Sequence, residues 1–324
     1  MFSSPHELIF YAGTYTDRGI PSDGIYGYKL KFNDDYSNFT YVSLGSTEVI
    51  SPSFLTITND KKYLLAVSET KDNSESKISS YKILSDGNLE YVNSQSSLGT
   101  FTCYVSVSPN NDFAGVHPQR QEAPHVHMIR SSPSGRYIYV TDLGNDAIYK
   151  LDFDASNGFS TTNMKTFKTP AGAGPRHFDF HPCGDYLYLS CELANTVNVF
   201  RVKSKETGDL ELLQTLSSLP DGVKESMIAE IRVDATGRFL FVSNRGPDNI
   251  AVFAIENSGA KLSLKNYYLT NGKTPRNFDV SGQILIAANQ DSDNLSIFRL
   301  DNLGGLTPIG DQIRCPQPVR VKIL

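Results

Sequence analysis

The chain has 324 residues, a formal net charge of −5 and 20% charged residues. This length is enough for one large domain or for two smaller ones. The modest acidic balance excludes a broad basic surface for nucleic acid or for an anionic membrane, so any anion would be bound by a local group of arginines.

The sequence has the features of neither a targeting signal nor a CxxC cysteine motif. The first residues, MFSSPHELIFYAG, lack the basic start and the long apolar core of a secretory signal, and no apolar run approaches the ~18 residues of a membrane span. The four cysteines, Cys103, Cys183, Cys191 and Cys315, form no CxxC pair. We therefore expect a cytoplasmic protein with reduced thiols, and a Cys183–Cys191 disulfide is the less favoured alternative.

The chain begins with short alternating runs that predict strands. Residues 8–15 and 24–32 look like the middle and outer strands of a blade that lacks its first strand. The same apolar alternation returns in residues 319–324. We expect residues 319–324 to pair beside residues 8–15, because this pairing would close a ring of sheets without a free edge.

The next two units differ in completeness. The second runs from Pro52 to Tyr91, with residues 71–77 as a polar loop, whereas the third begins at residues 102–109 and then fails. Phe113 is followed within a few residues by the start of the fourth unit, so on the order of 35 residues are absent at this period. We predict that part of one blade is missing from the sequence near Phe113 and Ala114, since a half blade would leave an open sheet edge.

Four later units share one frame of strand, turn, strand and strand. They superpose on the turn glycines, whose spacings are 49, 53 and 45 residues: Gly135, Gly184, Gly237 and Gly282. Repeats of this period made of short strands are typical of a β-propeller. The sequence therefore predicts an all-β, seven-bladed propeller of four-stranded antiparallel blades, with residues 1–324 as a single domain.

The frame also predicts where a site would lie. The start of the first strand and the end of the second strand share one edge of an antiparallel hairpin. Ionisable and polar residues that differ from unit to unit occupy these places: His125, His127, Arg176, His177, Arg276, Asp142, Glu192, Arg245 and Gln290. A position that only packs would hold interchangeable residues, so this divergence predicts a ligand site.

Each candidate has a chemical and a structural interpretation. Arg176 and Arg245, with Arg276 as a third candidate, suit a carboxylate or phosphate, although an arginine can also tie loops to a carboxylate. Glu192 suits a general base acting on water, or a structural salt bridge with Arg176. Asp142 suits a bond to backbone amides at a strand end.

The two histidines of PHVH do not support a metal site. His125 and His127 alternate along a strand, so at most one of them faces the site, and no cysteine-rich or carboxylate-rich spacing suits zinc. One of them suits an acid or base near neutral pH, or a histidine buried inside a blade. We predict no metal and no cofactor.

Several segments resemble one known family. They are PHVH from Pro124, SPSGRYIYVTDLG from Ser132, GPRHFDFHP from Gly174, AEIRVDATGRFLFVSNRG from Ala229 and GKTPRNFDV from Gly272. They are similar to the seven-bladed propeller lactonases, which include bacterial 6-phosphogluconolactonases and fungal carboxymuconate cyclases. The resemblance covers nearly the whole chain after Leu8, although a His usually follows the Arg where this chain has Asn277.

The resemblance implies metal-independent hydrolysis of a sugar lactone. The expected substrate is 6-phosphogluconolactone, a lactone of the pentose phosphate pathway in carbohydrate metabolism. The implied catalytic residues are His127, Arg176, Glu192 and Arg245. From their places in the strand frame, we expect His125, His177, Arg276, Asp142 and Gln290 to bind substrate as well. Two alternatives stay open, a lactonising cyclase that acts on a dicarboxylate and a non-catalytic propeller that binds a small anion or a protein. We expect a small anionic lactone as partner, no nucleic acid or membrane, and a monomer or weak homo-oligomer.

Overall fold

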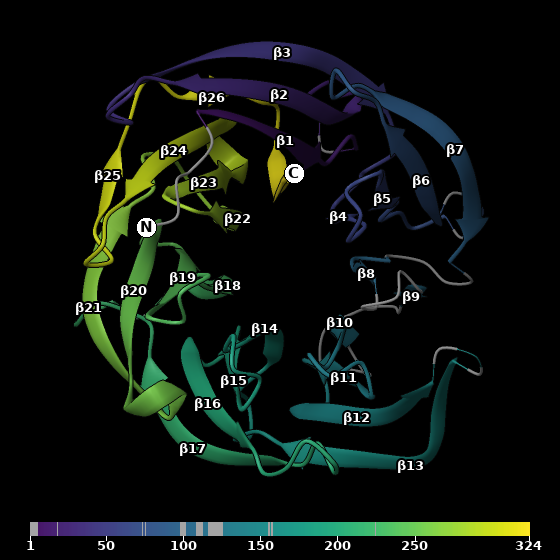
Figure 1. The fold of residues 1–324 in the computed structure, drawn as a ribbon, viewed down its shortest axis with the longest axis vertical. Coiled ribbons are helices and arrows are strands. Elements are labelled where there is room, and N and C mark those ends of the chain that lie inside the picture. The colour runs from purple at the N-terminus through teal and green to yellow at the C-terminus, as the bar shows by residue number, and fades with distance from the viewer. Residues whose placement is uncertain are drawn as a thin grey trace. The chain divides into compact units, whose positions relative to one another are not determined.

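The computed structural model describes residues 6–17, 19–72, 74, 76–97, 102–107, 113–115, 126–154, 156, 158–223 and 225–324. The regular elements in this part of the chain are strands, apart from two three-residue 3-10 turns, Asn257–Gly259 and Gln290–Ser292 (Figure 1). The chain forms two compact units, which we call unit 1 (Met1–Val105 with Tyr268–Leu324) and unit 2 (Ser106–Tyr267).

Unit 1 contains three antiparallel sheets. The first has the order β27-β1-β2-β3 and consists of Pro318–Ile323, Glu7–Thr14, Gly24–Phe32 and Phe39–Glu48. The second has the order β4-β5-β6-β7, with Leu55–Ile57, Tyr63–Val67, Lys77–Ile83 and Leu89–Ser96. The third has the order β22-β23-β24-β25, with Pro275–Ser281, Ile284–Asn289, Asn294–Leu300 and Leu306–Pro308, and β26 (Ile313–Arg314) also pairs with β24.

The strand nearest the C-terminus completes the sheet that holds the first strand of the chain. β27 lies antiparallel to β1, with Phe10 opposite Ile323 and Ala12 opposite Val321. The predicted pairing of residues 319–324 with residues 8–15 is therefore confirmed. Without β27, the main-chain groups of β1 would form an open edge.

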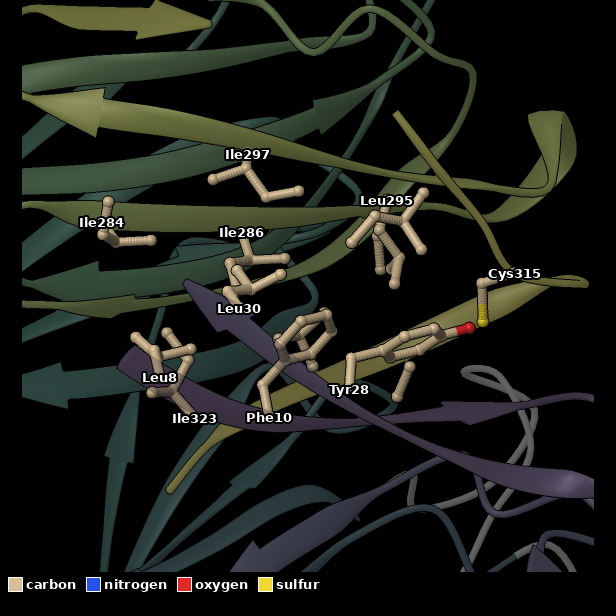
Figure 2. Close-up of a cluster of buried hydrophobic side chains, with 14 of the residues drawn as sticks. Leu8, Phe10, Tyr28, Leu30, Ile284, Ile286, Leu295, Ile297, Cys315 and Ile323 are labelled. Carbon is tan, nitrogen blue, oxygen red and sulfur yellow. The ribbon is translucent and has the colours of Figure 1, made fainter. Parts of the chain in front are cut away.

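Apolar residues at alternate positions along these strands form the core of unit 1. Phe10, Leu30, Ile286, Leu295 and Val321 share one cluster and are each 0% exposed. Figure 2 shows the first four of these side chains. These residues come from the sheet of β1 and from the sheet of β22, so the cluster joins two sheets of unit 1. Full burial of side chains of this size contributes roughly 1.5–3 kcal/mol each.

Unit 2 contains three further sheets of four strands each. β10 to β13 are Val126–Ser131, Tyr137–Asp142, Ala147–Asp154 and Gly158–Lys168. β14 to β17 are Pro175–Phe180, Tyr186–Cys191, Thr196–Val202 and Leu210–Ser217. β18 to β21 are Met227–Val233, Phe239–Arg245, Asn249–Glu256 and Lys261–Leu269. In each of these three sheets the strands follow one another in chain order, as the repeat predicts.

Short polar side chains tie consecutive sheets of unit 2 together. Asp146, at a φ of 49°, accepts hydrogen bonds from the backbone amides of Gly172 and Gly174 at 2.7 and 2.8 Å. The hydroxyl of Thr141 donates to the carbonyl of Arg176 at 2.6 Å, and the hydroxyl of Ser190 donates to the carbonyl of Ala229 at 3.1 Å. These bonds hold the first strand of each following sheet close to the second strand of the sheet before it.

The predicted gap falls in a part of the chain with little described structure. β8 (Val105–Val107) and β9 (Phe113–Gly115) form a two-stranded sheet. Residues 98–101, 108–112 and 116–125 lie outside the described residues. The described sheets are five of four strands, one of five and this one of two. The missing segment near Phe113 and Ala114, the count of seven blades and the single domain therefore stay predictions.

Two smaller expectations can be compared with the structure. All four cysteines, including Cys183 and Cys191, are free, so the less favoured disulfide is absent. Across the described residues, no helix has the length and apolar character needed to cross a membrane.

Candidate functional site

Glu192 lies between two arginines in unit 2. Its Oε2 atom accepts a hydrogen bond from Nε of Arg176 at 2.7 Å, and Nη2 of Arg245 lies 3.1 Å from the same oxygen. The three side chains are 1%, 3% and 4% exposed. The structure thus brings together three of the predicted site residues, and the group of two guanidiniums and one carboxylate has an excess of positive charge.

Strand ends place these three residues. Arg176 is the second residue of β14, Glu192 directly follows β15, and Arg245 ends β19. The backbone amide of Glu192 donates to the carbonyl of Gly174 at 2.7 Å, and Nε of Arg245 donates to the carbonyl of Met227 at 3.0 Å. Starts of first strands therefore meet ends of second strands, as the antiparallel frame predicts.

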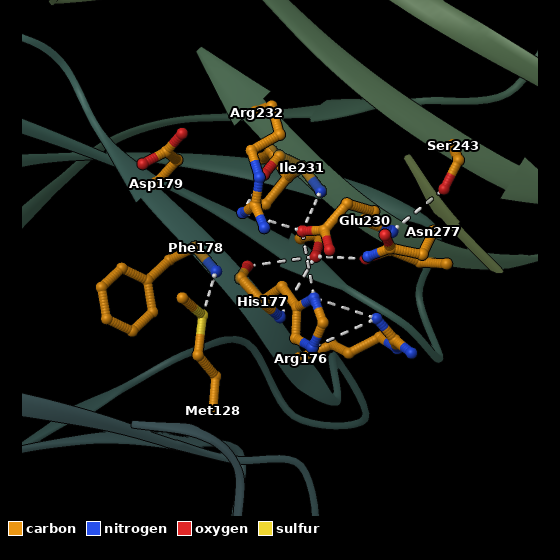
Figure 3. Close-up of polar contacts among 12 residues, drawn as sticks. Met128, Arg176, His177, Phe178, Asp179, Glu230, Ile231, Arg232, Ser243 and Asn277 are labelled. Atoms are coloured by element: carbon orange, nitrogen blue, oxygen red, sulfur yellow. Dashed lines mark hydrogen bonds and ion pairs between the residues drawn. The ribbon is translucent and has the colours of Figure 1, made fainter. Parts of the chain in front are cut away.

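A second buried group adjoins the first. Nδ1 of His177 lies 3.1 Å from Oε1 of Glu230, and Nη1 of Arg232 lies 3.0 Å from the same oxygen (Figure 3). Nη1 of Arg176 lies 3.2 Å from Nδ1 and 3.4 Å from Nε2 of His177. His177 therefore connects the carboxylate of Glu230 to the guanidinium of Arg176.

His177 is a neutral imidazole at physiological pH. Burial, and after it the positive charge of Arg176, lower the pKa of His177 to about 3 against the opposing effect of Glu230. A neutral ring has one N–H group and one lone pair. An Nδ1–H group that donates to Glu230 leaves the Nε2 lone pair to accept a hydrogen bond from Arg176.

His127 contacts this group from the sheet of β10. Its ring centroid lies 4.9 Å from that of His177, and the two ring planes form an angle of 72°. The side chain of His127 is half-buried, whereas His177 is 3% exposed. His125, the other histidine of the pair, lies outside the described residues.

The remaining predicted site residues have other surroundings. Asp142 accepts hydrogen bonds from the backbone amide of Asn145 at 3.1 Å and from its side-chain amide at 2.7 Å. These bonds match the structural role considered for Asp142, a bond to a backbone amide at a strand end. Arg276 and Gln290 belong to unit 1, where the guanidinium of Arg276 lies 5.5 Å from the ring centroid of Tyr15. Their grouping with the residues of unit 2 stays a prediction.

The sequence frame places Glu230 close to a first-strand start without assigning it a role, and it does not single out Arg232. Both lie on β18, in the run IAEIRV, and Glu230 is 0% exposed. A carboxylate within an apolar strand is a signal in itself, because such a group is rarely buried without a charged or hydrogen-bonding partner.

The arginine group lies apart from the cavity of unit 2, and the described residues form no group suited to a metal ion. Among the side chains that the structure describes, no group of three or more His, Cys, Asp or Glu is placed to hold a metal ion. A cavity of about 210 Å³ is lined by residues that include Ser132, Phe180 and Gly184. These residues lie at or beyond the far ends of β10 and β14, so this cavity does not contain the arginine group.

Comparison with known proteins gives consistent matches over most of the chain. A family model described as "Lactonase, 7-bladed beta-propeller" matches residues 9–114 and 110–323. An uncharacterized protein of Staphylococcus aureus strain N315 is 31% identical over 306 residues, which cover 83% of this chain and 85% of that protein. Two solved structures are also similar. A candidate 6-phosphogluconolactonase of Bacteroides fragilis has a TM-score of 0.86 and 28% identity, with 98% of each chain covered. The periplasmic gluconolactonase PpgL of Pseudomonas aeruginosa has a TM-score of 0.87 and 25% identity, with 98% of this chain and 99% of that chain covered.

Proposed function

Since the chain belongs to the seven-bladed β-propeller lactonase family, we propose that it hydrolyses a sugar lactone and that 6-phosphogluconolactone is its substrate. The observation that carries this proposal is the buried group in which Glu192 holds the guanidiniums of Arg176 and Arg245. Similar solved structures named for 6-phosphogluconolactone or gluconolactone hydrolysis support the reaction class.

The arginines supply the charge that the reaction requires. Hydrolysis of a lactone places negative charge on the carbonyl oxygen as water adds, and donors fixed in a water-poor site stabilise that charge strongly. A guanidinium also matches a phosphate or a carboxylate through two parallel hydrogen bonds. Arg176 and Arg245, held 2.7 and 3.1 Å from one carboxylate oxygen, are fixed in place before substrate binds.

His127, rather than Glu192, is the proposed general base. One oxygen of Glu192 already interacts with both guanidiniums, which stabilise its anionic form and favour a role in holding the arginines. His127 is only half-buried and lies against the ring of His177. Imidazole changes charge near neutral pH, which suits proton transfer.

The steps balance as a simple hydrolysis. His127 removes a proton from water while the water oxygen bonds to the lactone carbonyl carbon. The ring C–O bond then breaks, and the leaving oxygen takes the proton from the imidazolium of His127. The products are one carboxylate, one hydroxyl group and a proton released to solvent. A positioned base of this kind contributes ~10²–10⁴-fold to the rate.

A pH-stat assay tests this function directly. Wild-type protein should hydrolyse 6-phosphogluconolactone with a higher kcat/KM than unphosphorylated gluconolactone, because the phosphate adds an arginine-bound group. Arg176→Ala and His127→Gln should each lower kcat/KM at least ~10²-fold. Arg201→Ala is the matched control, since Arg201 lies on β16 in an exposed ion pair with Glu211.

The outcomes separate the possible functions. Wild-type rates in Arg176→Ala and His127→Gln would refute this site. Equal turnover of the two lactones would refute the phosphorylated substrate and leave a broader lactonase. Absence of turnover with both lactones would refute lactone hydrolysis and leave the cyclase and the anion binder to be tested.

A further inference from the structure

Glu230 is buried more deeply than its chemistry favours. It is 0% exposed on β18, and its Oε1 atom lies 3.1 Å from Nδ1 of His177 and 3.0 Å from Nη1 of Arg232. The backbone amide of Ile231 also donates to this oxygen at 3.0 Å. Removing a carboxylate from water is costly unless charged and hydrogen-bonding partners compensate. Three partners converge on one oxygen here, so Glu230 is held as an anion.

His177 transmits the effect of Glu230 to Arg176. The side chain of His177 contacts an acceptor, Oε1 of Glu230, through Nδ1, and Nη1 of Arg176 lies 3.2 Å from Nδ1 and 3.4 Å from Nε2 of the same ring. The carboxylate requires the hydrogen on Nδ1, so Nε2 is the ring nitrogen that keeps a lone pair for the guanidinium. With the hydrogen on Nε2 instead, Nδ1 would be the nitrogen that accepts from Nη1 of Arg176, and its lone pair would also face the carboxylate of Glu230. The tautomer therefore decides which ring nitrogen the guanidinium binds.

We propose that Glu230 is a positioning residue for lactone hydrolysis, which fixes the tautomer of His177 and thereby the orientation of the Arg176 guanidinium. The inference rests on the proposed function, because Arg176 is the group that would contact substrate. Arg232 has a supporting role, since its guanidinium balances the charge of Glu230. Neutral His177 is essential to the arrangement, and its low pKa keeps it neutral across the pH range of an assay.

Kinetics of two Glu230 variants test the positioning role. Glu230→Ala should lower kcat/KM about 10- to 100-fold, because a small misplacement of a substrate-holding group costs on this order. Glu230→Gln retains an oxygen that accepts from Nδ1–H, so it should recover most of the loss. Glu211→Ala is the matched control, because it removes a glutamate of the same unit from an exposed ion pair. Thermal unfolding of each variant establishes that it is folded, and Glu230→Gln keeps the test valid if Glu230→Ala does not fold.

A double-mutant cycle separates positioning from a general structural effect. If Glu230 acts through His177, Glu230→Ala, which lowers kcat/KM about 10- to 100-fold in the wild-type background, should change it less than about twofold in a His177→Phe protein. Losses that multiply would overturn the proposal. The pH dependence of kcat/KM between pH 5 and 9 should have the same shape in wild type and Glu230→Gln. A limb that disappears in Glu230→Gln would make Glu230 the proton acceptor and overturn the positioning role.

The tautomer itself gives a readout that does not need activity. Long-range ¹H–¹⁵N correlation spectra of the imidazoles, assigned with His177→Phe, should show His177 protonated on Nδ1 in wild type and partly on Nε2 in Glu230→Ala. Protonation of His177 on Nε2 in wild type would overturn the inference. If wild type fails to hydrolyse lactones, the proposed function fails by that assay alone, whereas the spectra separately decide whether Glu230 sets the tautomer.

Discussion

The buried, neutral His177 predicts how the stability of the protein depends on pH. An unfolded histidine has a pKa near 6.5, and burial lowers the pKa of His177 to about 3 in the folded state. Between these values the unfolded chain binds a proton that the folded protein does not, so stability falls as pH falls. The stability that comes from the neutral state of His177 is fully present above pH 6.5. About 2 kcal/mol of it is lost at pH 5, because each pH unit below 6.5 removes about 1.4 kcal/mol.

Urea unfolding at several pH values measures this contribution. His177→Gln removes the titrating ring, so the free energy of unfolding of wild type minus that of the variant should fall by about 2 kcal/mol between pH 7.5 and pH 5. Taking this difference cancels the other titrating groups. His6→Gln, which removes an exposed histidine, is the control for the loss of any imidazole. A difference that stays constant within about 0.5 kcal/mol would refute the neutral, buried state of His177.

Three further predictions concern thiols, a turn and a strand. Iodoacetamide at pH 7.5 should modify the exposed Cys183 much faster than Cys191. Cys191 is 0% exposed, and burial raises the pKa of its thiol to about 12. Equal modification rates of the two cysteines, measured by mass spectrometry, would contradict this prediction. Gly237→Ala should lower the free energy of unfolding by about 1–3 kcal/mol more than Gly222→Ala does. The new Cβ at position 237 would lie 2.6 Å from the imidazole of His181, whereas Gly222 has open space at a similar φ. Equal urea midpoints of the two variants would contradict this prediction. Deletion of residues 318–324 should abolish the cooperative thermal transition seen by circular dichroism, because the edge of β1 opposite β2 would lose its partner strand. An unchanged Tm would show that β27 is dispensable.

Local pattern predicts part of the site well. Arg176, Glu192 and Arg245 each stand at a strand end that the turn glycines and the period of two define, and the structure brings them within hydrogen-bonding distance. His177 and Glu230 meet across two sheets, and such a contact depends on the spacing of the sheets and on rotamers. Neither quantity is encoded in the alternation of apolar and polar residues.

The outer strand of the third sheet of unit 1 shows a second limit. It is divided into β25, which ends at Pro308, and β26, which begins at Ile313. Pro308 lacks an amide hydrogen, and Gly310 has a φ of 58°, so a continuous ladder is interrupted there. The repeat frame predicts an outer strand at this place, but the location of the break depends on how this edge packs.

The pairing of β1 with β27 has a consequence for biosynthesis. The two strands are separated by about 300 residues of sequence, so β1 emerges from the ribosome long before β27 is synthesised. During that interval its unpaired main-chain groups are accessible to the same strand of another nascent chain. A circular permutant that encodes β27 immediately before β1 would shorten this delay, and it should give a larger yield of native protein during translation at high concentration.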